Sequence, residues 1–383
     1  MKIGIVCYPT FGGSGVIATE LGKTLAEKGH AVHFITYSQP FRLETFLENI
    51  FYHEVRVSHY PLFEYSPYES ALTSTLVDVG LHEQLDLIHV HYAIPHASVA
   101  YMARAIMAAH GVYVPFVTTL HGTDITLIGK DSSYMPVVTF AINESNAVTA
   151  VSKSLRDDTY KFFQTKKRIE VVPNFIDLKR FSKKPKEHFR KAIAPFGEKL
   201  IVHASNFRKV KRVGDVLKVF SKIHERIPSK LLLIGDGPER IQIEQYCRES
   251  VMCNDIRFLG RQEAVEEIYS VCDLFILASE TESFGLAALE AMACQVPIIS
   301  TNTGGIQELN IYGVTGFLSN VGDVDDMARN AITILENSET LRKFKANALT
   351  RAKEFDLQKI LPRYEKVYES VLEKTKTAEV KVE

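Results

Sequence analysis

The cysteines of this chain are few, and their arrangement argues against both a disulfide framework and a zinc site. The 383 residues include five, namely Cys7, Cys247, Cys253, Cys272 and Cys294. Their number is odd, they are scattered, and no C-x-x-C pair occurs. Disulfide frameworks and zinc sites normally use paired, closely spaced cysteines. The pattern therefore argues against both and favours a reducing, cytoplasmic location.

Long apolar runs and a large net charge are also missing. No apolar stretch of about 18 residues occurs, so no membrane insertion is expected. Residues 1–6 read as a core strand and lack the cleavage site of a signal peptide. The formal net charge of −1 gives no support for nucleic acid as a partner. The chain is long enough for two or three domains, with an ordinary 46% of hydrophobic residues.

Strand-like and helix-like patterns alternate through both halves of the sequence, which predicts βαβ units and parallel sheets. The strands expected in the first half are 2–7, 31–36, 87–91, 116–120 and 147–151. Those expected in the second half are 200–204, 231–235, 256–259, 274–278 and 297–300. Residues 183–188, charged and broken by proline, are interpreted as a linker. A last helix is expected near 361–373, where apolar residues follow helical spacing.

The segment from Glu282 to Glu290 carries the most informative functional pattern. Two carboxylates flank the start of an expected helix, just after an expected buried strand. Between them, backbone N–H groups without a helical partner and the helix dipole can hold a phosphate. One acid can then bind sugar hydroxyls and the other ribose hydroxyls, as a sugar nucleotide requires. The alternative is that the acids merely complement the helix dipole.

A glycine-rich loop, residues 12–15, follows the first expected strand and opens a helix. Glycines allow close approach of the backbone, and the helix start offers anion-binding amides. The G-x-G-x-x-G fingerprint of dinucleotide-binding proteins is not matched, because Ala18 occupies the last position. A substrate-contacting loop and a simple tight turn remain as alternatives.

Histidines lie in or just after two expected strands of the first half. His121 follows one of them and can exchange a hydrogen bond with a sugar hydroxyl or carbonyl, unless its own loop satisfies it. His89 and His91 share one face of a strand. No acid or cysteine accompanies them at ligand spacing, so no metal site is expected. Tyr92 and His96, in the following loop, suit polar contact with a substrate.

The second half adds a basic loop and two strand ends. Four cations occupy residues 208–212 at the carboxyl end of an expected strand, where a diphosphate would need them. A solvated charged loop is the usual alternative. Gly235 begins a G-D-G-P turn that is interpreted as mainly structural. Arg261 ends another strand and can stack on a nucleotide base.

Together, these segments resemble the retaining glycosyltransferases of family 4, which include sucrose-phosphate synthase-like and trehalose synthase-like enzymes. The shared pattern is the glycine-rich loop, the histidine of the first domain, the basic loop with its lysine, G-D-G-P, and E-S-F-G-L-x-x-L-E followed by G-G. The resemblance implies the α/β GT-B fold: two Rossmann-like domains facing across a cleft, with the C-terminal helix returning to the first. The expected domains are 1–183 with a helix at about 358–375, and 184–357.

The resemblance also implies roles for individual residues. Catalysis is expected of His121, Lys211 and Glu282. Donor binding is expected of Gly15, Asn206, Arg208, Arg212, Gly235, Arg261, Ser283, Phe284, Gly285, Leu286 and Glu290. Acceptor binding is expected of Gly13, Ser14, Tyr92, Thr123 and Lys153. Family members usually carry arginine where this chain has Asn206, so the cations that assist Lys211 stay undetermined. Neither a metal nor a cofactor is expected.

Residues 7–16, 91–96, 119–124 and 205–212 further resemble one branch of the family. That branch transfers N-acetylglucosamine from UDP-GlcNAc to the hydroxyl of L-malate, the first step of bacillithiol synthesis. UDP-GlcNAc and L-malate are therefore the expected substrates, and a homo-oligomer is left open. The alternatives are another sugar or lipid acceptor, a GT-B UDP-GlcNAc 2-epimerase, a nucleotide-sugar binding protein without turnover, and an NAD-dependent dehydrogenase.

Overall fold

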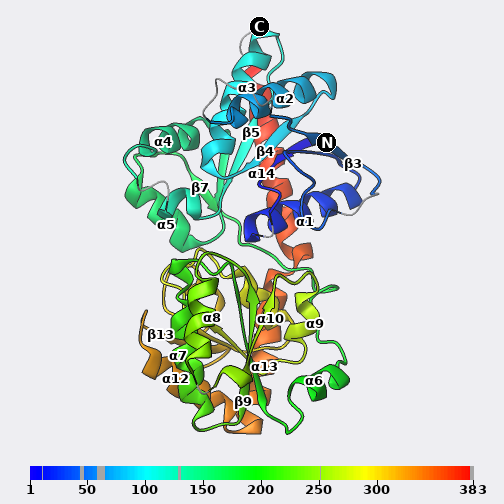
Figure 1. Cartoon of the computed structure of the whole chain (residues 1–383). Helices are drawn as coiled ribbons and strands as arrows, with labels where there is room; N and C mark the ends of the chain where they lie inside the picture. Colours follow the sequence, from blue (N-terminus) through cyan, green and yellow to red (C-terminus); the bar gives the residue numbers. More distant parts are fainter. Residues whose placement is uncertain (11, 44–46, 58–64, 128–130, 251, 380–383) are drawn as a thin grey trace. The chain divides into compact units, whose positions relative to one another are not determined.

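The computed structural model describes residues 1–10, 12–43, 47–57, 65–127, 131–250 and 252–379. The chain divides into two compact units (Figure 1). The first comprises Met1–Pro173 and Ile360–Glu383, and the second comprises Asn174–Lys359. None of the described helices combines the length and the apolar character needed to cross a bilayer.

The first unit is built on a seven-stranded sheet with the order β3-β2-β1-β4-β5-β6-β7. All neighbouring strands run parallel. The strands are β1 (Lys2–Val6), β2 (Ala31–Thr36), β3 (Ile50–Glu54), β4 (Leu87–His91), β5 (Phe116–Leu120), β6 (Ala147–Ala150) and β7 (Ile169–Val171). The strand order reverses between β1 and β4, and ligands of such sheets bind beyond the carboxyl ends of the strands at that point.

Helices cover this sheet and bury its apolar strands. They are α1 (Gly13–Glu27), α2 (Tyr68–His82), α3 (Ser98–Ala109), α4 (Met135–Glu144), α5 (Lys153–Phe162) and the C-terminal α14 (Leu357–Glu379). From Ile360 onward α14 belongs to the first unit. Its Tyr368 hydroxyl lies 2.8 Å from Nδ1 of His89 in β4, and its Glu365 pairs with Lys28 at 2.7 Å. The expected return of the C-terminal helix to the first domain is confirmed.

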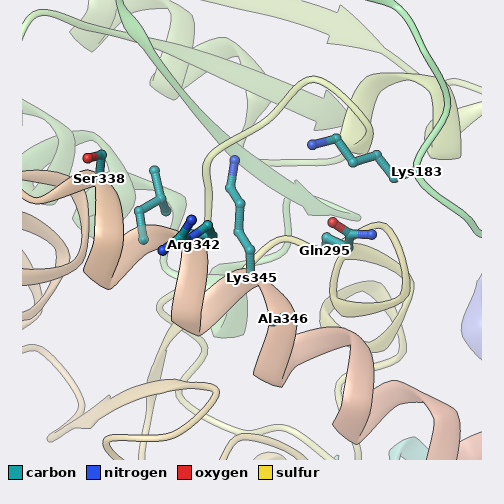
Figure 2. A pocket seen from close by; sticks show the side chains of 7 residues that line it. Lys183, Gln295, Ser338, Arg342, Lys345 and Ala346 are labelled. Atoms are coloured by element: carbon teal, nitrogen blue, oxygen red, sulfur yellow. The ribbon is translucent and has the colours of Figure 1, made fainter.

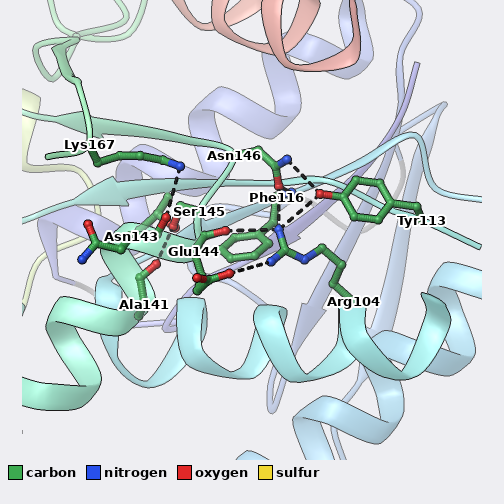
Figure 3. Close-up of polar contacts among 10 residues, drawn as sticks. Arg104, Tyr113, Phe116, Ala141, Asn143, Glu144, Ser145, Asn146 and Lys167 are labelled. Carbon is green, nitrogen blue, oxygen red and sulfur yellow. Dashed lines mark hydrogen bonds and ion pairs between the residues drawn. The ribbon is translucent and has the colours of Figure 1, made fainter. Parts of the chain in front are cut away.

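A polar cluster around Arg104 joins α3 to the ends of α4 and β5 (Figure 3). The Arg104 guanidinium donates to the carbonyl of Glu144 at 3.1 Å and to Oδ1 of Asn146 at 3.0 Å. The same Asn146 oxygen accepts from the amide of Phe116, the first residue of β5, at 3.0 Å. Arg104 also lies over the Phe116 ring, 4.8 Å from its centre. These contacts fix the position of β5, the strand that ends just before His121.

The second unit holds a six-stranded parallel sheet with the order β10-β9-β8-β11-β12-β13. Its strands are β8 (Lys199–Ser205), β9 (Ser229–Gly235), β10 (Ile256–Gly260), β11 (Leu274–Leu277), β12 (Ile298–Thr301) and β13 (Gly316–Ser319). Its helices are α6 (Glu187–Ile193), α7 (Val213–His224), α8 (Arg240–Arg248), α9 (Val265–Tyr269), α10 (Leu286–Ala293), α11 (Ile306–Leu309), α12 (Val324–Leu335) and α13 (Ser338–Ala352). The order reverses between β8 and β11, so this unit repeats the design of the first.

The boundary between the two units lies between Pro173 and Asn174, ten residues before the expected boundary at 183/184. Ile176 forms a bridge with Asp356, and Phe181 is buried, so this stretch packs within the second unit. The interpretation of residues 183–188 as a linker is wrong. The amide of Lys184 donates to Ser270 at 3.0 Å, and α6 begins inside the segment.

Candidate functional site

In the first unit, expected site residues gather beyond the carboxyl ends of β1, β4 and β5. The Tyr92 hydroxyl donates to Oγ of Ser14, at the start of α1, at 2.8 Å. The side chain of Thr123 also lies near the Tyr92 hydroxyl. A Cβ on Gly15 would lie 2.5 Å from the carbonyl oxygen of Tyr8, so the tight turn itself requires this glycine. Gly13 is exposed, and α1 has no side-chain cap and no acid in its first turn. Its first amides therefore suit an anion.

Two histidines form a directly bonded pair at the same edge. Nδ1 of His91, the last residue of β4, lies 2.8 Å from Nε2 of His121, which follows β5. Burial, with a smaller effect of His96, lowers the pKa of His121 to about 3. Burial and the neighbouring histidines also hold the pKa of His91 well below its usual value. Both rings are therefore neutral near pH 7, and a single proton is shared between the two facing nitrogens.

Asp124 ties the two histidine-bearing loops together. Its Oδ2 accepts from the amide of Ala93 at 2.8 Å, and its Oδ1 accepts from the amide of Gly122 at 3.0 Å. The side chain is buried, and burial raises its pKa to about 6. Asp124 follows Thr123 directly but is not among the site residues predicted from the sequence. The structure makes it the residue that positions the loop after β5.

Lys153 is placed differently from the other expected acceptor residues. It is the exposed first residue of α5, which lies beside the short turn η2 (Thr123–Leu127). Ser152 caps the helix by accepting from the amide of Leu155 at 3.0 Å. The structure therefore puts Lys153 on a helix that contacts the element carrying Thr123, and Ser152 serves as the cap of that helix.

In the second unit, the expected lysine and acid meet. Lys211, in the short 3₁₀ turn η4 (Lys209–Lys211), donates to Oε2 of Glu282 at 2.7 Å. Ser279 donates to the same oxygen at 3.3 Å. The amide of Glu280 donates to the carbonyl of Val210 at 2.8 Å, which joins the two loops. A cation and a carboxylate thus share one edge of the sheet, where β8 and β11 end side by side.

The G-G motif has a steric role in holding Glu282. The amide of Gly305 donates to the carbonyl of Glu282 at 2.8 Å. A Cβ on Gly304, whose φ is 58°, would collide with that same carbonyl oxygen. Residues with a side chain rarely adopt this φ, so glycine satisfies both the conformation and the close approach.

The start of α10 is open to an anion. Gly285 stands at the N-cap with a φ of 94°, and the helix has neither a side-chain cap nor an acid in its first turn. The first amides and the positive end of the helix dipole are therefore not neutralised by the helix itself. Phe284 is buried beside them, whereas Ser283 and Leu286 are partly exposed. Glu290 lies within α10 and is 8% exposed.

The remaining candidates for donor binding differ in how they are held. Arg212 is paired with Asp215 at 2.5 Å, so its charge is already compensated. Arg208, Asn206 and Arg261 are exposed at strand ends. Gly235 permits a close approach, since a Cβ there would collide with the carbonyl of Ser205. Lys211 is accordingly the cation that the structure joins directly to Glu282.

A surface cavity of the second unit lies elsewhere (Figure 2). Its volume is about 340 Å³, and it is lined by Lys183, Gln295, Ser338, Leu341, Arg342, Lys345 and Ala346. Gln295 follows the carboxyl end of α10, whereas Glu282 precedes its amino end. Lys345 is bonded to Asp273 at 2.7 Å. None of the expected site residues lines this cavity, so it is not the donor site.

Comparison with known families defines the class of protein. Residues 11–180 match the family model "Glycosyltransferase Family 4", and residues 185–351 match "Glycosyl transferases group 1". The chain belongs to this family of glycosyltransferases and adopts the α/β GT-B fold with two Rossmann-like domains, as expected. Among its relatives is N-acetyl-alpha-D-glucosaminyl L-malate synthase of Bacillus anthracis, which is 46% identical over 99% of this chain and 100% of the relative.

A more distant sequence relative and two solved structures of similar fold extend the comparison. An uncharacterized glycosyltransferase of Methanocaldococcus jannaschii is 25% identical over 96% of this chain and 97% of its own length. The Anabaena protein HepE, solved in complex with UDP and glucose, has a TM-score of 0.81 at 20% identity and covers 97% of this chain and 100% of its own. A sucrose-phosphate synthase of Thermosynechococcus elongatus also has a TM-score of 0.81, at 19% identity, covering 97% of this chain and 99% of its own.

Proposed function

We propose that this glycosyltransferase transfers N-acetylglucosamine from UDP-GlcNAc to the hydroxyl of L-malate, with retention of the α-anomeric bond. This reaction is the first step of bacillithiol synthesis. Support for the two substrates comes from the full-length similarity to the Bacillus anthracis synthase, at 46% identity. The observation that carries the chemistry is the contact between Lys211 and Glu282 at the open start of α10.

The donor diphosphate is proposed to bind between Lys211 and the first amides of α10. Without a ligand, Glu282 compensates the Lys211 ammonium at 2.7 Å. A bound diphosphate would share that ammonium, leaving Glu282 to accept from sugar hydroxyls. Glu290 would accept from the ribose hydroxyls, and Arg261 would stack on the base. Charge placed in advance where the UDP leaving group develops negative charge lowers the barrier to bond cleavage.

The acceptor is proposed to bind in the first unit. Gly13 and Ser14 offer amides at the start of α1, and the hydroxyls of Tyr92 and Thr123 lie beside them. Lys153 would supply a charge for the second carboxylate of malate. His121 would contact the donor sugar as a neutral hydrogen-bonding group, in keeping with its lowered pKa. The acceptor proton would leave with the departing phosphate in a front-face reaction.

The reaction is proposed to need neither a metal nor a cofactor, because Lys211 supplies the positive charge at the leaving group. Activity should therefore persist in excess EDTA, and its loss on chelation with recovery on adding one divalent ion would contradict this. A cytoplasmic location is part of the same proposal, in keeping with five cysteines that form no disulfide.

Release of UDP with a panel of acceptors tests the function. Purified enzyme with UDP-GlcNAc should release UDP with L-malate, and mass spectrometry should find one N-acetylglucosaminyl malate per UDP. Glycerol, a glucose phosphate and a polyprenyl phosphate serve as competing acceptors. Equal turnover of any of these would contradict the malate assignment. Loss of UDP-GlcNAc without any acceptor would instead favour a 2-epimerase.

A further inference from the structure

Two histidines and a glutamate from three separate elements meet in the first unit. His33 lies in β2, His53 lies in β3, and Glu83 directly follows α2. One ligand atom of each residue, a ring nitrogen or a carboxylate oxygen, lies within 4.8 Å of the other two. The three residues are 20 to 50 positions apart in the sequence. Only the folded sheet and its covering helix bring them together.

The two imidazoles are already spaced as metal ligands are. Nδ1 of His33 lies 3.0 Å from Nε2 of His53, and the rings are stacked at an interplanar angle of 17°. Two nitrogens bound to one tetrahedral zinc ion at about 2.0–2.1 Å would be about 3.3 Å apart. A small separation of the rings would therefore admit an ion. A carboxylate oxygen of Glu83 lies within 4.8 Å of a ring nitrogen of each histidine and is the candidate third ligand.

The surroundings suit a cation with an open coordination position. His33 is 2% exposed and is fixed on a strand, whereas His53 and Glu83 are partly exposed at the edge of the sheet. Water can therefore complete the coordination, and an ion can enter from solvent. Asp78, earlier on α2, adds a second negative charge near His53. The Lys2 ammonium donates to the carbonyl of Glu83 at 2.9 Å and places one opposing positive charge near His33.

This cluster is separate from the residues proposed for sugar transfer. Glu83 lies in the connection that enters the amino end of β4. Ser14 and His121, by contrast, follow the carboxyl ends of β1 and β5. In a parallel sheet these ends form opposite edges. A metal bound here would cross-link β2, β3 and α2 and would not act on the substrates.

We propose that His33, His53 and Glu83 form a binding site for one divalent transition-metal ion, with Zn²⁺ as the best match. Two imidazoles, one carboxylate and a water are a set of ligands that zinc accepts in tetrahedral geometry. An ion that binds the folded chain but not the unfolded chain raises the free energy of unfolding, and more so the tighter it binds. The ion would therefore stabilise the edge strand β3.

Metal titration of the untagged full-length chain tests this site. After removal of bound metal, calorimetry with Zn²⁺ should show one site per chain, and Co²⁺ should give the visible absorption bands of a four-coordinate complex. His53→Asn and Glu83→Gln should each weaken Zn²⁺ binding by at least about a hundredfold, because even outer-sphere partners cost about 10–100-fold. The exposed His188 lies in the second unit, so His188→Asn is the matched control and should bind normally.

Thermal unfolding supplies a second readout. Zn²⁺ should raise the Tm of the wild type and of His188→Asn, but not that of His53→Asn or Glu83→Gln. Replacing the buried His33 could disturb folding by itself. The test therefore relies on replacing His53 and Glu83, which are partly exposed. The absence of a saturable Zn²⁺ site in the wild type, or equal binding by all variants, would overturn the proposal.

Discussion

Replacement of Lys211 by alanine is the sharpest test of the proposed donor site. The side chains of Lys211 and Glu282 are 19% and 13% exposed, and their charged atoms are 2.7 Å apart. The substitution removes the cation while Ser279 still donates to the Glu282 carboxylate at 3.3 Å. Its effects on stability and on turnover should therefore differ widely in size.

The expected loss of stability is small. Exposed ion pairs contribute about 0.2–1 kcal/mol, and this pair remains partly accessible to solvent. The free energy of unfolding should therefore fall by about 1 kcal/mol or less. The loss of turnover should be much larger, because a preorganised charge that acts on the leaving group is worth about 3 kcal/mol, or about a hundredfold in rate.

Initial rates of UDP release at saturating substrates measure the loss of turnover, and urea unfolding measures the loss of stability. Lys209→Ala is the matched control, since Lys209 is exposed in the same turn and should be dispensable. Glu282→Gln, and the double variant with Lys211→Ala, complete a cycle that isolates the coupling between the two charges. If Lys211→Ala keeps turnover within a factor of about three of the wild type, the role assigned to this lysine is wrong.

Three further outcomes are expected. Glu290→Ala should weaken binding of UDP alone in calorimetry, whereas Glu282→Ala should mainly lower turnover; unchanged UDP affinity in the Glu290 variant would exclude its ribose role. Lys153→Ala should raise the KM for L-malate strongly, since losing a charge partner of an enclosed carboxylate costs about 2–5 kcal/mol. UDP-GlcNAc binding should stay unchanged in that variant. Burial, with a smaller effect of His121, lowers the pKa of His89 from 6.5 to about 3. The stability that neutral His89 contributes is therefore present above pH 6.5 and is lost below it, by about 1.4 kcal/mol per pH unit. The free energy of unfolding, measured in urea from pH 7 to 4.5, should fall less steeply with decreasing pH in His89→Gln, by about this slope. An unchanged slope would contradict the assignment of His89 as neutral.

Most of the sheet architecture could be predicted from the sequence, because central parallel strands are continuous apolar runs. All ten expected strands are present, with ends that differ by at most two residues. Three strands were missed, and each lies at a sheet edge. β3 is largely exposed, β7 has only three residues, and β13 begins at a glycine. A Cβ on that glycine, Gly316, would collide with the carbonyl of Ile298, a constraint that apolar patterning does not express.

The sequence could predict which strand each site residue follows, but not which side chains contact one another. Lys211 and Glu282 were each placed after an expected strand, and because these strands are neighbours the two residues meet at one edge of the sheet. The pairing of Arg212 with Asp215 depends on side-chain conformation within the first turn of α7. The Ser14–Tyr92 bond also depends on side-chain conformation, and it joins residues 78 positions apart. Residue type and spacing do not determine such contacts.

The histidine pair limits what His121 can contribute to the proposed reaction. With one proton between Nδ1 of His91 and Nε2 of His121, each ring keeps one further nitrogen. Nε2 of His91 is buried and lacks a hydrogen-bond partner among the described residues, which costs about 1–3 kcal/mol. Burial thus keeps both rings neutral at the expense of an unsatisfied nitrogen. A neutral His121 can orient a sugar hydroxyl but cannot compensate a leaving diphosphate. In the proposed reaction, that charge is therefore assigned to Lys211 and the amides of α10.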